Sequence, residues 1–117
     1  MVDEITTDEL KNRIESDGDI QVLDIREEHE IKNGYVEGAI HVPMSRLTLE
    51  LGEYDWTEEI YVICRHGNSS IQASRLLMAY EGVSDDATVA SVAGGYQDWE
   101  YELVEGESKT EPTKAAA

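Results

Sequence analysis

One side chain in this sequence is well suited to act as a nucleophile: Cys64, the only cysteine of the chain. It follows residues 60–63 (Ile-Tyr-Val-Ile), a run of strand formers without polar alternation, which is typical of a central strand in a parallel sheet. A helix is predicted a few positions later, over residues 71–80. Cys64 is therefore expected at the carboxyl end of a strand, the edge at which open α/β sheets bind ligands.

The loop that follows Cys64 is suited to hold negative charge. A turn from a strand into a helix points successive backbone N–H groups and the positive end of the helix at one place. Arg65 adds a cation, and His66 can add a second. Such surroundings favour the thiolate, which is the reactive form of cysteine.

Small and hydroxyl-bearing residues complete the loop. Gly67 permits a tight, left-handed backbone, and Ser69 and Ser70 can donate hydrogen bonds to an anion or to a persulfide. Asn68 or Ser69 can cap the following helix. A lone cysteine is most often a small buried apolar residue, but the strand end, the glycine and the serines favour a nucleophile here. We therefore predict that Cys64 is catalytic and that the substrate-binding loop consists of Arg65, His66, Gly67, Asn68, Ser69 and Ser70.

Strands and helices alternate along the chain, which predicts a three-layer α/β fold with a mostly parallel central sheet flanked by helices. Thr6 and Glu9 have capping-box spacing at the start of the first helix, and Ser45 is expected to cap a later one. Strands are expected over residues 20–25, 60–64 and 87–92, with a brief one within 38–43. Helical segments are expected over residues 6–15, 27–32, 45–51, 71–80 and 96–100.

The length of 117 residues fits one domain, predicted over residues 1–104 and followed by a polar, disordered tail over residues 105–117. A single cysteine excludes internal disulfides and cysteine-cluster metal sites. The apolar runs are too short to span a membrane, and residues 1–4 have no signal-peptide character. We expect a cytoplasmic monomer.

The chain is strongly acidic, with 26 Asp and Glu against 9 Lys and Arg and a net charge of −17. Such a surface repels nucleic acids and anionic membranes, so neither is expected as a partner. Two interpretations stay open. The surface can dock a basic partner, or it can reflect adaptation to high salt, where screening makes the self-repulsion tolerable.

Three segments together resemble the motifs of rhodanese domains. Residues 23–27 (LDIRE) and 34–43 (GYVEGAIHVP) are similar to the paired N-terminal motif, residues 64–70 to the active-site loop, and residues 93–99 (AGGYQDW) to the closing motif. The loop is especially similar to that of single-domain thiosulfate sulfurtransferases, some of which share its Gly-Asn-Ser-Ser ending. The resemblance implies a rhodanese-like fold.

The resemblance also implies a sulfurtransferase without a metal or an organic cofactor. The Cys64 thiolate would take a sulfane sulfur from thiosulfate or another small anionic donor, and the resulting persulfide would pass it to a thiol or a sulfur-carrier protein. Asp24 and Arg26 are implied to form a structural ion pair that supports the site. Many members carry Arg where this chain has Ser69, so the pocket has one cation fewer and the donor stays open.

Two other functions compete with sulfur transfer. Phosphatases and arsenate reductases on a similar sheet bind an oxyanion in a loop of Cys, five residues and Arg, but Ser70 stands at that Arg position. The second alternative is a non-catalytic rhodanese-like module that holds a protein partner. Such modules often lack the cysteine, and Cys64 is present.

Adaptation to high salt predicts that the free energy of unfolding rises with salt concentration. Raising potassium chloride from about 0.1 M to about 1 M shortens the Debye length from ~10 Å to ~3 Å, which weakens the repulsion among the 26 acidic residues. Urea unfolding at a series of potassium chloride concentrations measures the effect. Equal stability in dilute buffer and in molar salt would contradict this interpretation.

Overall fold

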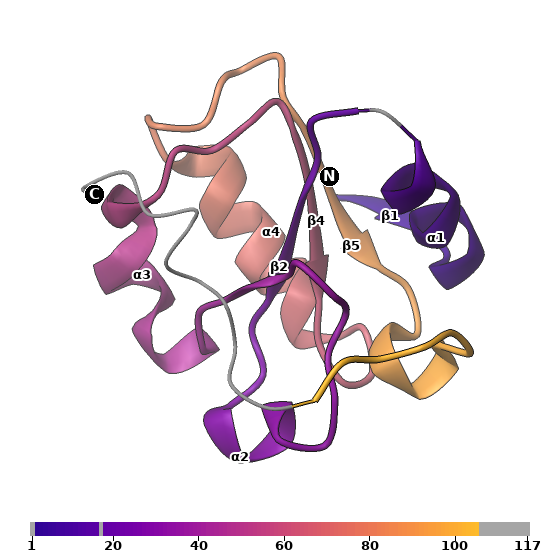
Figure 1. Ribbon diagram of the computed structural model, residues 1–117. Coiled ribbons are helices and arrows are strands. Elements are labelled where there is room, and N and C mark those ends of the chain that lie inside the picture. Colours follow the sequence, from indigo (N-terminus) through magenta and orange to yellow (C-terminus); the bar gives the residue numbers. More distant parts are fainter. Residues whose placement is uncertain (1, 17, 106–117) are drawn as a thin grey trace.

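The computed structural model describes residues 2–16 and 18–105, and a five-stranded sheet lies at its centre (Figure 1). The strands are β1 (Asp3–Ile5), β2 (Gln21–Asp24), β3 (Ile40–His41), β4 (Glu59–Ile63) and β5 (Thr88–Val92). They lie in the order β1-β5-β4-β2-β3, and every neighbouring pair is parallel. The prediction of an α/β fold around a mostly parallel sheet is confirmed.

Helices cover both faces of this sheet and so form the outer layers (Figure 1). The first face is covered by α3 (Leu47–Glu50) and α4 (Ser69–Ala79), and the second by α1 (Thr7–Glu15). A single turn, α2 (Glu28–Ile31), follows β2. The 3₁₀ turns are η1 (Met44–Arg46), η2 (Leu51–Glu53) and η3 (Gly95–Asp98).

Alternate residues of the central strand β4 pack into two separate cores. Ile60 and Val62 belong to the core under α3 and α4. Tyr61 and Ile63 belong to the core under α1, where Leu10 is fully buried. Because both faces of β4 are covered, its sequence is apolar without alternation, as a buried parallel strand requires.

The helix starts agree with the predicted caps in one case and differ in two. Thr6 Oγ1 accepts the Glu9 N–H at 3.1 Å and Glu9 Oε1 accepts the Thr6 N–H at 2.9 Å, so the capping box is present. Ser45 caps nothing, because it lies inside η1 and its hydroxyl donates to the Glu27 carboxylate at 3.4 Å. The helix expected over 45–51 is instead the succession η1, α3 and η2. Helix α4 begins at Ser69 rather than at residue 71, and its cap residue Asn68 makes no side-chain capping bond.

Strand β1 was not predicted, because its first two residues, Asp3 and Glu4, are exposed and polar on the edge of the sheet. β1 forms because it pairs in parallel with β5, where Ile5 lies opposite Val92. The expected tail lies outside the described residues, apart from Glu105, and stays a prediction. No helix within residues 2–16 and 18–105 is long and apolar enough to cross a membrane.

The turn at η3 closes against the backbone that follows β4. The Tyr96 N–H donates to the carbonyl of Cys64 and the Gln97 N–H donates to the carbonyl of Arg65, both at 2.9 Å. Gly95 has a φ of +54°, and a Cβ there would lie 2.1 Å from the Cys64 carbonyl oxygen. Glycine is therefore required for this approach, which holds the start of the Cys64 loop in place.

Replacing Gly95 by alanine is expected to destabilise the fold far more than the same change at Gly38. Both glycines have positive φ, but nothing lies within 4 Å of a Cβ at Gly38. Gly38→Ala then has only the conformational cost of about 1–2 kcal/mol, whereas Gly95→Ala adds a backbone clash and reaches about 3–4 kcal/mol. Urea unfolding measures both free energies. Equal losses in the free energy of unfolding would show that η3 does not pack tightly against the Cys64 loop.

Candidate active site

The Cys64 sulfur lies in a cradle of backbone N–H groups. Cys64 directly follows β4 and is only 6% exposed. Its Sγ accepts the Gly67 N–H at 3.1 Å and the Ser70 N–H at 3.4 Å. Two backbone N–H donors are therefore aimed at this one sulfur.

Gly67 gives the loop the turn that builds this cradle. Its φ is +94°, and a Cβ there would lie 2.8 Å from the Gly94 nitrogen and 3.2 Å from the Val92 carbonyl oxygen. The expectation of a left-handed glycine is confirmed. The loop therefore packs directly on the chain that leaves β5.

A buried hydroxyl pair lies behind the sulfur. Ser70 Oγ is 3.4 Å from Cys64 Sγ and 2.7 Å from Ser91 Oγ of β5. Both serines are fully buried, and the Ser74 hydroxyl donates to the Ser70 carbonyl at 2.7 Å. Ser91 was not predicted at the site. A lone hydroxyl between the apolar Ala90 and Val92 marks Ser91 as a buried polar residue, but it does not reveal the contact with Ser70.

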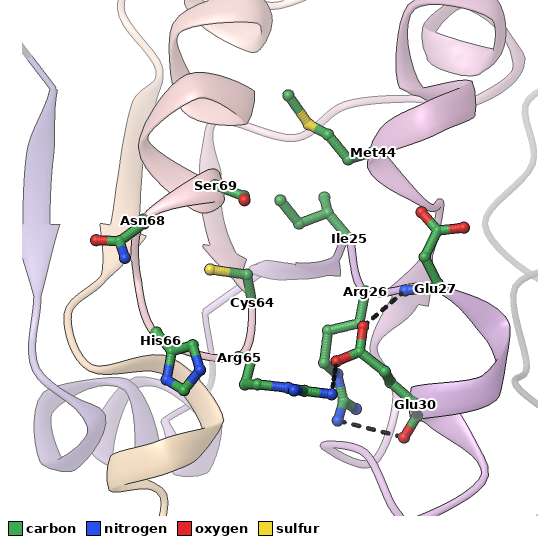
Figure 2. Close-up of a pocket in the computed structure, with 10 residues that line it drawn as sticks. All are labelled: Ile25, Arg26, Glu27, Glu30, Met44, Cys64, Arg65, His66, Asn68 and Ser69. Carbon is green, nitrogen blue, oxygen red and sulfur yellow. Dashed lines mark hydrogen bonds and ion pairs between the residues drawn. The ribbon is translucent and has the colours of Figure 1, made fainter.

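A cavity of about 250 Å³ opens beside Cys64 (Figure 2). Five residues of the predicted catalytic and substrate-binding loop line it, namely Cys64, Arg65, His66, Asn68 and Ser69. Gly67 and Ser70 contact the sulfur but do not line the cavity. The opposite wall consists of Ile25, Arg26, Glu27, Glu30 and Met44, and only Arg26 among these was predicted.

The two expected cations of the loop are engaged with other side chains. The Arg65 guanidinium reaches away from Sγ to form an ion pair with Glu30 of α2 (Figure 2). His66 Nδ1 lies at hydrogen-bond distance, 2.5 Å, from the Gln97 side-chain oxygen. Backbone N–H groups, and not these two side chains, therefore face the sulfur.

Asp24 and Arg26 form a buried ion pair at the end of β2. Arg26 Nη2 lies 2.9 Å from Asp24 Oδ2 and also donates to the Gly34 carbonyl at 2.8 Å. Burial lowers the pKa of Arg26, but the hydrogen bond and charge of Asp24 outweigh it and raise the pKa. The guanidinium thus stays charged beside the cavity.

Tyr96 of η3 joins this ion pair to the closing segment of the fold. Its hydroxyl donates to Asp24 Oδ2 at 2.7 Å and accepts the Val36 N–H at 3.0 Å, and its ring lies 3.6 Å from the Arg26 guanidinium carbon. Burial, followed by the charge of Asp24, raises the pKa of Tyr96. The hydroxyl therefore remains a donor. Within the described residues, no group of three or more His, Cys, Asp and Glu is placed to hold a metal ion.

Comparison with known proteins identifies the class of this fold and site. Residues 6–102 match the family model of the Rhodanese-like domain. A solved rhodanese-like domain protein from Staphylococcus aureus has a TM-score of 0.77 and 29% identity, over 91% of this chain and 100% of that one. The chain belongs to the rhodanese-like domain family, as its motifs predicted.

Two curated relatives carry names that refer to sulfur chemistry. The thiosulfate sulfurtransferase GlpE of Shewanella oneidensis is 32% identical over 80 residues, which are 68% of this chain and 75% of GlpE. YrkF of Bacillus subtilis, named as a candidate sulfur carrier protein, is 31% identical over 98 residues, or 84% of this chain. This chain spans about half of YrkF, since the match covers 51% of that protein. The relatives support a role in rhodanese-type sulfur transfer.

Removing the Tyr96 hydroxyl is expected to destabilise the protein by about 1–3 kcal/mol, because Tyr96→Phe leaves the Val36 N–H and an Asp24 oxygen without their partner. Tyr101→Phe is the matched control, since its hydroxyl bonds to Asp8 on the exposed surface, and it should cost about 0.5 kcal/mol or less. Urea unfolding of both variants measures the difference. A Tyr96→Phe protein as stable as the control would show that Tyr96 does not tie the ion pair to η3.

Proposed function

We propose that this protein is a sulfurtransferase that carries a sulfane sulfur as a persulfide on Cys64, with thiosulfate or another persulfide as donor. The observation that carries the proposal is the Cys64 Sγ beside a cavity of about 250 Å³, facing the N–H groups of Gly67 and Ser70. A thiolate nucleophile needs no general base to activate it. The family and the names of the relatives support the same chemistry.

The first half-reaction loads the enzyme. The Cys64 thiolate attacks the outer sulfur of the donor, and a new S–S bond forms while the donor's own S–S bond breaks. With thiosulfate, the electron pair of the broken bond leaves with sulfite, and no oxidant or reductant is consumed. The backbone N–H groups of Gly67 and Ser70 that face Sγ stabilise the negative charge of the persulfide.

The second half-reaction unloads the sulfur. The thiolate of an acceptor, a small thiol or a sulfur-carrier protein, attacks the terminal sulfur, and the Cys64 thiolate leaves. Because the chain contains no second cysteine, the persulfide cannot collapse into an internal disulfide and must pass its sulfur to another molecule. Two separate half-reactions predict ping-pong kinetics. A reducing cytoplasm, where a lone thiol stays reduced, suits this cycle.

The alternative is a module that binds a protein partner without catalysis. The net charge of −17 gives this chain an acidic surface, which supports docking to a basic partner. It gives no reason, however, for two N–H groups aimed at the only thiol. We therefore favour the enzyme.

Intact mass spectrometry tests the proposal. Incubation with thiosulfate, or with an alkyl persulfide if thiosulfate fails, should add one sulfur atom to the protein. Cyanide should remove it as thiocyanate, and Cys64→Ser should never gain it. Ser84→Ala, a change on the exposed surface, is the control and should load like the unmodified sequence. A protein that gains no sulfur from either donor would favour the binding module.

A further inference from the structure

The wall of the cavity opposite Cys64 carries negative charge. Glu27 and Glu30, at the start of α2, both line the cavity and face the loop from the other side (Figure 2). Glu30 is held in place because its Oε1 accepts the Glu27 N–H at 3.2 Å. Neither carboxylate was expected at the site, which was predicted to take an anionic donor.

The arginines that line the cavity are already neutralised. Arg26 is paired with the buried Asp24. Arg65 is paired with Glu30, whose side chain is only 16% exposed. The charges within each of these two ion pairs cancel, so the negative charge of the Glu27 carboxylate is left over. Its neighbour at 3.4 Å is the uncharged hydroxyl of Ser45. The Arg, Asp and Glu side chains around the sulfur therefore sum to a negative value.

This excess of negative charge affects which sulfur donor the site binds, a question that the proposed function leaves open. A thiosulfate dianion that approaches Cys64 meets the uncompensated Glu27 and an arginine that Glu30 already holds. Ser69 adds no cation. A donor that brings a positive charge of its own meets an attractive wall instead, since opposite charges attract strongly across a partly buried cavity.

Building on the proposed sulfur transfer, we infer that the site selects small thiol persulfides that carry an ammonium group, over inorganic dianions, and that Glu30 determines this selectivity by neutralising Arg65. In the loading step the Cys64 thiolate attacks the outer sulfur of R–S–SH. The new S–S bond forms at Cys64 while the S–S bond of the donor breaks, and its electron pair leaves on R–S⁻. The proton of the transferred sulfur passes to R–S⁻, so the products are the Cys64 persulfide anion and the thiol R–SH. No further reactant is needed.

A matched set of donors tests the selectivity. Cysteamine persulfide and 3-mercaptopropionate persulfide have the same two-carbon chain, but the first ends in an ammonium group and the second in a carboxylate. Thiosulfate is the third donor. Loading rates of Cys64 are measured by intact mass in about 1 M potassium chloride, where a Debye length of ~3 Å suppresses the general repulsion of the acidic surface. Cysteamine persulfide should load faster than its carboxylate counterpart by at least about threefold.

Two variants on one helical turn separate the cavity from its surroundings. Glu30→Gln keeps the oxygen that accepts the Glu27 N–H but releases Arg65, so it should raise the rate with thiosulfate at least about threefold and reduce the preference for the ammonium donor. Glu28→Gln removes the same charge outside the cavity, where Glu28 is 73% exposed, and should leave the ratio of rates unchanged. Glu27→Gln should also reduce the preference.

The outcomes distinguish this inference from the proposed function. Equal loading by the two matched persulfides, or the same ratio of rates in Glu30→Gln and Glu28→Gln, would overturn the inference while sulfur transfer stands. Faster loading from thiosulfate than from cysteamine persulfide would overturn it as well. Failure of all three donors to load Cys64 would overturn the proposed function and the inference with it.

Discussion

The proposed sulfur transfer places negative charge on a buried sulfur, and this is the constraint on which the rest of the structure depends. Cys64 is 6% exposed, and a buried anion is tolerated only where hydrogen-bond donors face it. Here the donors are the backbone N–H groups of Gly67 and Ser70. Backbone donors stay aimed at the sulfur only while the loop keeps its shape, so the proposed reactivity of Cys64 depends on the rigidity of the loop.

That rigidity comes from segments far apart in the sequence, and Tyr96 connects them. Its N–H donates to the Cys64 carbonyl, while its hydroxyl donates to Asp24 and accepts from Val36. One residue therefore ties the loop to the Asp24–Arg26 pair and to the segment that precedes β3. This explains in physical terms why three separate motifs occur together: each supplies one partner of the same hydrogen-bonded arrangement.

The sequence predicted those parts of the site that follow from local chemistry. The strand end at Cys64, the positive φ of Gly67 and the capping box of Thr6 depend on neighbours within a few residues. The sequence did not predict contacts between side chains that are far apart along the chain and meet only in the folded structure. Glu30 was expected only as part of the helical segment over residues 27–32, yet it pairs with Arg65, which lies 35 positions later. Ser91 meets Ser70 only because β4 and β5 are neighbours, and no local pattern reveals that distance.

The same difference between local and tertiary effects separates the two roles of acidic residues in this chain. The exposed carboxylates produce a long-range repulsion that molar salt screens. Glu30 acts at short range, because it is largely buried and in direct contact with Arg65, and salt screens such contacts much less. In molar salt the acidic surface therefore has little electrostatic effect on a donor, while the proposed discrimination by charge in the cavity remains. Selectivity then follows from which arginines are already paired and not from the net charge of the protein.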